Sequence, residues 1–471
     1  MGTVLPDDVL LLIGEQLEDP ADRWNLVFAS RHFHDLFLPL AYRTIFLYNW
    51  RYARPFFNAI TKRPSLARAV REFSSHYWYP EHISEADRDE IRKSSALSER
   101  VKELSNSPIE KIQWEEHLSR GFSDAWIALI LPFLSQLREL HLSYEMRTPF
   151  LDLVLQRAIS GERPFLQQPA FQHLRKVSLN RLTNVDHSNS PENEDDHADP
   201  PSSLLLRLFQ LPSMRSIFAY SVVDLGKPPS NNQENNEQSP AGFSPITEID
   251  LRSTCGSQAM YALIASCANL KSFKYQHSDS HVLSQGYQPT ALYKSLAHSK
   301  ASLQTLWLDQ YGMHHAFTAS GLNQMHDEWF GSLADFTALR DLRIRLPNLL
   351  DIRYQKEPST PLEQCLPSLL ERLFIEGCKE QDLPMLVSQL QTVVRNRHSR
   401  VPNLQYLDIE GTTRSSERGD LFSLFSPGFD TNEDILGVVE PLHGDCITAG
   451  IDLHLHDRFF AEHLHCGVDF C

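Results

Sequence analysis

The chain has 471 residues, of which 41% are hydrophobic and 22% charged, and its formal net charge is −16. This length exceeds what one compact core usually holds, so we expect two domains or a solenoid. The acidic balance disfavours nucleic acid and anionic membrane surfaces as main partners, because both attract basic proteins.

The cysteines and the N-terminus bear on the compartment. Seven cysteines without a close-spaced framework favour reduced thiols, so we expect an intracellular protein, cytoplasmic, nuclear or both. The apolar N-terminal stretch follows Asp7 and Asp8 and has no basic residue ahead of it, which is unlike a signal peptide. No run of about 18 apolar residues occurs, so we expect no membrane span.

Three short helices are predicted in the first part of the chain. Residues 5–17 carry a proline suited to a first helical position and apolar residues at four-residue spacing. Asp19 is expected to cap, and Pro20 to open, a second helix over residues 20–29. Ser30 is expected to cap a third helix, which we expect to end at Pro39. So small a unit buries little surface alone and needs a partner or the next domain.

This N-terminal unit resembles an F-box. The family pattern is Leu-Pro with an acidic residue, an apolar helix, Asp-Pro-x-Asp, and then a small residue, Arg and an aromatic. The matching residues are 5–9, 13, 17, 19–22 and 26–33, and residues 38–45 are similar to the segment that closes many fungal F-boxes. Ser30 and Phe33 depart from the commoner Cys and Trp. An ordinary helical cap on a repeat protein is the alternative.

A hexad of the form Leu-x-x-Leu-x-Leu recurs along the rest of the chain. Its fourth positions are Leu140, Val177, Ile217, Ile249, Phe273, Leu306, Leu342, Leu373 and Leu407. Helical stretches lie between the hexads, at residues 125–133, 151–159, 259–266 and 383–394. One strand and one helix per unit, repeated about every 24 to 40 residues, are the signature of a leucine-rich-repeat solenoid.

We therefore expect an α/β protein with two parts. Residues 1–47 form a three-helix F-box, and residues 48–471 form an irregular leucine-rich-repeat solenoid with parallel strands and with helices on the convex side. Roughly ten repeats are expected. Disordered insertions are expected at about 184–203, which has six acids and no Lys or Arg, and at about 226–245, which is rich in Asn, Gln, Pro and Gly.

Enzyme motifs were not found: the sequence has no phosphate-binding loop, G-x-S-x-G, HExxH or paired C-x-x-C. We expect no catalytic residue, no cofactor and no metal. The potential zinc ligands cluster at the C-terminus and are His454, His456, His463, His465, Cys466 and Cys471. Residues 451–456 also alternate as a strand would, which makes them the last strand of the array. A metal-dependent enzyme at the C-terminus is the alternative.

The F-box resemblance implies a function. The chain would be the substrate-recognition subunit of a Skp–cullin–F-box ubiquitin ligase, with the F-box on the Skp-type adaptor of the cullin–RING ligase and the repeats on an unknown substrate protein. A scaffold in a non-degradative complex is the alternative. The residues expected to contact the adaptor are Leu5, Pro6, Val9, Leu10, Ile13, Leu17, Trp24, Val27 and Phe28.

The substrate is expected on the concave strand face. In a Leu-x-x-Leu-x-Leu strand, the residues beside the last two leucines face away from the core. The candidates are Phe218, Tyr220, Trp307, Arg343 and Arg345. Trp and Arg dominate interface energetics, and paired arginines bind carboxylate or phosphate in bidentate fashion. In the alternative, a loop or the C-terminal tail covers Trp307, or the two arginines pair with neighbouring acids.

Overall fold

The computed structural model describes residues 5–17, 19–78, 83–144, 148–166, 169–181, 204–221, 242–254, 258–277, 287–310, 327–411 and 433–457. The chain divides into two compact units, Met1–Ser221 and Val222–Cys471. The insertion expected at 184–203 lies outside the described residues, and so do residues 226–241 of the second insertion.

Residues 242–245 correct the boundary of the second insertion. Ser244 is fully buried and forms a parallel bridge with Cys267. Its amide donates to the carbonyl of Ser266 at 2.9 Å, and its carbonyl accepts from the amide of Ala268 at 3.2 Å. This short segment therefore belongs to the packed repeat, because its backbone groups find partners inside the fold.

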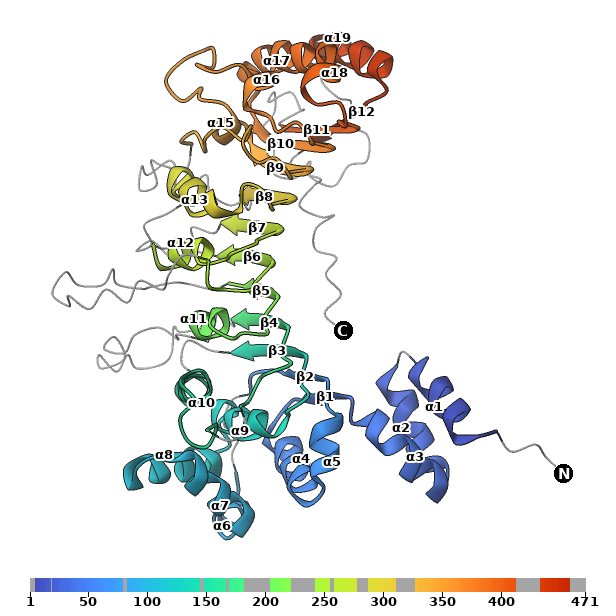
Figure 1. Cartoon of the computed structure of the whole chain (residues 1–471), viewed down its shortest axis with the longest axis vertical. Helices are drawn as coiled ribbons and strands as arrows, with labels where there is room; N and C mark the ends of the chain where they lie inside the picture. Colours follow the sequence, from blue (N-terminus) through green and yellow to red (C-terminus); the bar gives the residue numbers. More distant parts are fainter. Residues whose placement is uncertain are drawn as a thin grey trace, which may run out of the picture. The chain divides into compact units, whose positions relative to one another are not determined.

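The first unit begins with three helices: α1 (Asp7–Glu15), α2 (Pro20–Ala29) and α3 (Arg31–Ala41) (Figure 1). The two expected caps are confirmed. Asp19 accepts the amide of Ala21 at 2.8 Å, and Ser30 accepts the amide of Phe33 at 3.1 Å. The expectation that Pro39 ends the third helix is wrong. Pro39 has no N–H to donate to the preceding turn, yet the helix continues to Ala41, and the amide of Tyr42 bonds to the carbonyl of Leu38 at 3.1 Å.

Five parallel strands follow in the first unit, each hydrogen-bonded to the next in chain order. They are β1 (Thr44–Leu47), β2 (Glu72–Ser75), β3 (Glu139–Tyr144), β4 (Lys176–Arg181) and β5 (Ser216–Tyr220). The helices that connect them are α4 (Trp50–Lys62), α5 (Pro64–Ala69), α6 (Glu85–Arg92), α7 (Ser95–Leu104), α8 (Pro108–Ser119), α9 (Ser123–Ile130), α10 (Pro149–Ser160) and α11 (Leu204–Phe209). Helices α10 and α11 lie on one side of β3, β4 and β5 (Figure 1).

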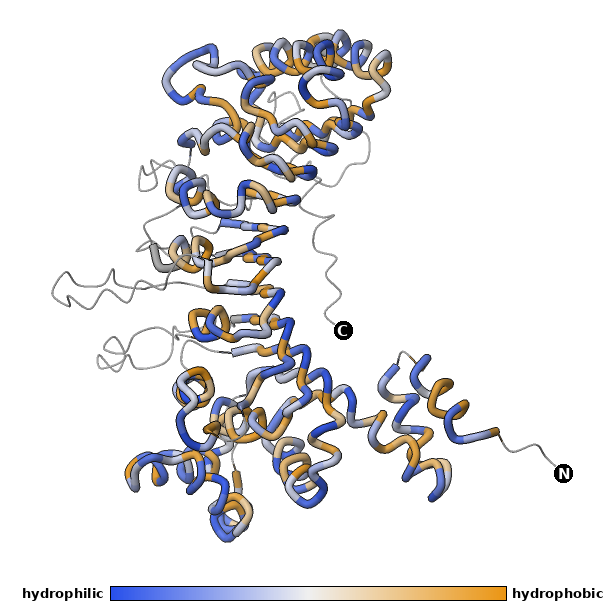
Figure 2. Tube along the Cα trace, in the orientation of Figure 1, coloured by the Kyte–Doolittle hydropathy of each residue, from blue (hydrophilic) through white to orange (hydrophobic). Residues whose placement is uncertain are grey.

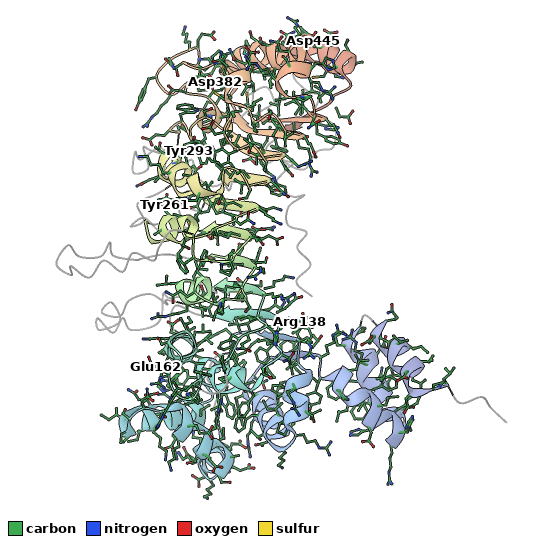
Figure 3. All side chains as sticks on the ribbon, viewed as in Figure 1. Arg138, Glu162, Tyr261, Tyr293, Asp382 and Asp445 are labelled. Carbon is green, nitrogen blue, oxygen red and sulfur yellow. The ribbon has the colours of Figure 1, made fainter. Side chains whose placement is uncertain are left out.

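The second unit holds seven parallel strands, also in chain order. They are β6 (Glu248–Thr254), β7 (Ser272–His277), β8 (Thr305–Gln310), β9 (Asp341–Arg345), β10 (Arg372–Cys378), β11 (Tyr406–Gly411) and β12 (Asp452–Asp457). The helices are α12 (Gln258–Ala265), α13 (Pro289–Ser295), α15 (Leu346–Leu349), α16 (Leu362–Cys365), α17 (Leu383–Arg395), α18 (Arg397–Arg400) and α19 (Glu433–Ala449). Asp445 on α19 accepts from Gln391 at 2.9 Å and from Arg395 at 3.1 Å, and so joins α19 to α17 (Figure 3).

The strand register confirms the hexads. Within each unit, every predicted anchor is paired directly with the anchor of the neighbouring strand, as Leu306 is with Leu342. All nine anchors are buried, and the tube of Figure 2 alternates between apolar and polar residues along the strands. The strand expected at 451–456 is confirmed as β12, which pairs with β11.

The strands β1 and β2 and the helices α6, α7 and α8 are among the elements that were not predicted. Ile45 on β1 and Phe73 on β2 extend the row of anchors, but each strand has only four residues and β2 reads Glu-Phe-Ser-Ser. Helices α6, α7 and α8 form an insertion between β2 and β3. This insertion is tied to the repeats by a partly buried ion pair, in which Arg157 of α10 lies 2.7 Å from Glu110 of α8.

Candidate functional site

The N-terminal bundle has a small core of its own. Val27, Phe37, Leu40 and Ala41 are buried, and the partly buried hydrophobic side chains around them are Leu10, Leu11, Trp24, Leu26, Phe33, Leu36 and Leu38. Leu10, Trp24 and Val27 were expected to contact the adaptor, and here they hold the three helices together. Their role in the bundle follows from burial, which sequence spacing alone does not reveal.

The opposite side of α1 is apolar and open to solvent. Leu5, Val9, Leu12 and Ile13 are between 38% and 60% exposed. Val9, Leu12 and Ile13 share one face of the helix by their spacing of three and four residues, and Leu5 lies two residues before the helix begins. We call these four residues the α1 stripe. Leu12 is the most exposed of them, and it was not predicted as a contact residue although its spacing of three residues from Val9 places it on the same face. Large apolar side chains grouped in solvent in this way mark an interaction surface.

The remaining predicted adaptor residues border the stripe or the core. Pro6 is exposed at the start of α1, and Leu17 is half-buried where α1 ends. Phe28 on α2 is 77% exposed, and its ring stacks on that of Trp24 at a centroid distance of 6.3 Å. Phe28 therefore offers a large apolar surface outside the bundle core.

The bundle holds α1 at a close contact with α3. A Cβ atom on Gly14 would lie 2.7 Å from Cε1 of Phe37 and 2.9 Å from Cδ2 of Leu40, so a larger residue there would have to displace one of these side chains. At the other end of α1, Asp7 lies 2.9 Å from Nε2 of His32. These two contacts orient α1 so that its stripe faces away from the bundle.

Tyr42 connects the bundle to the first repeat. Its ring packs against Trp24 at 5.5 Å and stacks on Phe56 of α4 at 6.1 Å. Burial raises the pKa of the Tyr42 phenol, so the side chain acts as a neutral packing residue. The bundle is thereby fixed on the repeat that follows it.

A second candidate surface runs across the strands of the second unit. Residues at matching positions of neighbouring strands form one row, which we call the Trp307 row; it consists of Asp250, Lys274, Trp307, Arg343, Phe374, Asp408 and His454. The row points away from the buried anchors, as the alternation of a strand requires. Two of the predicted substrate residues, Trp307 and Arg343, are neighbours in it.

The side chains of this row are already engaged with one another or with nearby charges. Nζ of Lys274 lies 3.7 Å from the centre of the Trp307 ring, and Nε1 of Trp307 donates to Asp341 at 3.1 Å. Arg343 is 8% exposed; it forms an ion pair with the buried carboxylate of Glu376 and lies over the ring of Phe374.

The other predicted substrate residues do not belong to the Trp307 row. Arg345 follows on β9 and is paired with Asp327 at 2.9 Å. Because Arg343 and Arg345 each face a carboxylate of the chain, an acidic ligand would have to displace that carboxylate. Phe218 and Tyr220 are on β5 of the first unit, where Phe218 is half-buried and Tyr220 is exposed. Binding by all five residues stays a prediction.

The C-terminal histidines are only partly described. His454 of β12 lies 3.4 Å from Asp408, while His463, His465, Cys466 and Cys471 fall outside the described residues. No group of three potential metal ligands comes together in the described part of the chain. In that same part, no helix has both the length and the apolar character to cross a membrane.

The described cysteines are buried free thiols: Cys267, Cys365, Cys378 and Cys446. Burial raises the pKa of Cys267 and of Cys378 to about 12 and that of Cys446 to about 11. Each thiol is therefore protonated near neutral pH, which makes these residues packing groups and poor nucleophiles.

The comparisons with known proteins address the repeats. A family model described as a leucine-rich repeat domain matches residues 49–414, which is the greater part of the chain. No curated protein matches the chain. The matched region begins after β1 and covers the strand–helix units from α4 to β11, and leucine-rich repeat domains bind partner proteins. The chain belongs to the leucine-rich repeat family.

Proposed function

We propose that this chain is the substrate-recognition subunit of a Skp–cullin–F-box ubiquitin ligase. The observation that supports this most directly is the α1 stripe, in which Leu5, Val9, Leu12 and Ile13 stand in solvent on a bundle with a small core. Together with the F-box resemblance of the sequence, the stripe is suited to an apolar contact with a Skp-type adaptor. The repeats would hold the substrate protein.

In this proposal the chain positions the substrate and takes no part in the chemical reaction. The adaptor links the bundle to the other ligase subunits, which transfer ubiquitin. The chain then needs neither a catalytic residue nor a cofactor, and the buried, protonated thiols are in keeping with that role. Substrate recognition would fall to the strand faces of the repeats, because they present rows of outward side chains to a protein surface.

The proposal is tested with charged substitutions in the stripe. In the Val9→Asp/Ile13→Asp double variant, binding to a purified Skp-type adaptor should weaken at least tenfold. Burial of each side chain at the contact would contribute about 1.5 kcal/mol or more, and a buried unpaired carboxylate adds a further cost. Ile112→Asp on α8 is the control, because Ile112 is also an exposed apolar residue on a helix but lies outside the bundle.

The measurement is titration calorimetry or pull-down with the full-length chain, and the melting temperature reports whether each variant is folded. Equal adaptor binding by the double variant and Ile112→Asp would overturn the F-box assignment. A reconstituted ligase then separates the degradative role from a non-degradative scaffold: ubiquitin transfer to a co-purifying protein supports the first, and adaptor binding without transfer supports the second.

A further inference from the structure

The residue immediately before each strand of the first unit is an arginine. In order from β1 to β5, these residues are Arg43, Arg71, Arg138, Arg175 and Arg215. From Arg71 onward, the backbone amide of each arginine donates to the backbone carbonyl of the arginine before the previous strand, at 2.7–2.8 Å. We call these five residues the arginine column; Arg138 is labelled in Figure 3. Neighbouring strands are about 4.8 Å apart, so the column is about 19 Å long.

The column faces solvent. Arg43, Arg138, Arg175 and Arg215 are exposed and Arg71 is half-buried. Within the described part of the chain, no carboxylate oxygen lies within 4 Å of the guanidinium of Arg71, Arg138 or Arg175, whereas Arg43 lies 4.0 Å from Glu15. Burial lowers the pKa of the Arg71 guanidinium, and the charges of Arg138 and Arg43 lower it further, so the neighbouring charges act on one another.

The acids of the adjacent row have other partners. Glu139 lies 3.1 Å from Lys176, and His141 lies between Glu72 and Glu139 at 3.6 and 3.9 Å. These carboxylates therefore pair with Lys176 and His141 on the strand face and leave the charges of the column largely uncompensated. Five like charges in line are unfavourable for folding, since like charges on neighbouring strands repel.

The second unit shows that the repeat itself does not require arginine here. Its residues at the same position are Thr247, Lys271, Gln304, Arg340, Glu371, Gln405 and Ile451. Where an arginine does occur, it is compensated, because Arg340 forms an ion pair of 2.5 Å with Glu371, the residue before the next strand. The uninterrupted column is thus particular to the first unit.

We propose that the arginine column binds an extended acidic segment of a protein partner. Guanidinium groups take carboxylates in bidentate fashion, and an extended chain presents a side chain on the same face about every 6.8 Å. About three carboxylates therefore fit along the column. A nucleic acid is disfavoured, because its long polyanionic backbone would meet a chain of net charge −16. The column is distinct from the α1 stripe, so this inference does not depend on the ligase proposal.

The probe is a fluorescent 12-residue peptide of alternating Glu and Ser, compared with its Gln and Ser analogue, in anisotropy titrations with the full-length chain. We expect the Glu peptide to bind, to bind more weakly as salt is added, and to lose at least tenfold in affinity with Arg138→Glu/Arg175→Glu. The matched control is Lys271→Glu/Arg340→Glu, which makes the same change in net charge at the same repeat position and should alter affinity by less than threefold.

Three outcomes would overturn the inference: no difference between the Glu and Gln peptides, equal losses in the two double variants, or tighter binding of a 12-nucleotide single-stranded RNA than of the Glu peptide. If the Glu double variant does not fold, Arg138→Gln/Arg175→Gln replaces it, since it removes the charges without adding acids. The affinity of that variant for the Glu peptide should fall about fivefold, and unchanged affinity would show that the column is not the binding surface.

Discussion

The α1 stripe and the Trp307 row both point away from a core, yet they differ in how their side chains are engaged. On α1, Leu12 and Ile13 are at least half exposed, on the face turned away from the bundle core. In the row, Lys274 lies over Trp307, and Arg343 is paired with Glu376. A side chain that points outward is therefore not always available to a ligand, because residues on neighbouring strands can already pair with it.

The largest effect is expected from breaking the buried pair in the row. Arg343→Ala removes the cation that neutralises the Glu376 carboxylate, which is 4% exposed, and we expect a loss of about 3–5 kcal/mol in the free energy of unfolding. The double variant Arg343→Met/Glu376→Leu should recover most of the lost free energy of unfolding. Urea denaturation of the full-length chain measures both. A loss below about 1 kcal/mol would mean that the pair is weakly coupled to the fold.

A buried anchor and a stripe residue should respond very differently to truncation. Leu342→Ala, at a fully buried position, should cost about 2–5 kcal/mol because it leaves a cavity between β9 and the helices. Ile13→Ala, at a half-exposed position, should cost under about 1 kcal/mol while weakening adaptor binding. Thermal unfolding measures both costs. Similar costs at the two positions would show that α1 packs its stripe inside the molecule.

Asp124 is a half-buried residue whose carboxylate accepts hydrogen bonds from two backbone amides, those of Phe150 at 2.8 Å and Leu151 at 3.1 Å. Burial raises the pKa of Asp124 to about 7, although the two amide bonds lower it. The folded chain then holds one proton more than the unfolded chain between about pH 4 and 7, so this group's stabilisation is complete below pH 4 and falls as pH rises to 7.

We expect the stability of the native chain to fall relative to Asp124→Asn over this pH range, by at most about 4 kcal/mol, since part of Asp124 reaches solvent. Melting temperatures from pH 4 to pH 8 measure the difference, with the exposed Asp89→Asn as control. A constant difference between the native chain and Asp124→Asn would show that Asp124 is ionised throughout.

The smallest effect on stability is expected for Trp307. Trp307→Phe keeps an aromatic face for Lys274 but removes the N–H that donates to Asp341, which should cost about 0.5–1.5 kcal/mol in the free energy of unfolding. The same variant tests substrate binding, because a loss of the co-purifying protein far beyond this cost would assign Trp307 to recognition. Unchanged co-purification would place recognition on other residues.

The repeats were predictable to the level of single residues, and the connecting segments were not. Each hexad carries three apolar positions at fixed spacing, so Leu306 and Leu342 were placed in register without a structure. The strand β2 has one large apolar residue, Phe73, and helices α6 to α8 interrupt the repeat, so periodicity carried no signal there. Leu12 could have been found from helical spacing, and the arginine column from the second position of the hexads at Arg138, Arg175 and Arg215.

Apolar periodicity and capping residues act over a few neighbouring positions, so they were enough to predict the core residues of the repeats and the helices of the N-terminal bundle. The packing of Leu10, Trp24 and Val27 into the bundle, the exposure of Leu12 and the pairing of Arg343 with Glu376 emerged only from the folded chain. Those outcomes depend on contacts between segments far apart in the chain, and local sequence patterns do not predict such contacts.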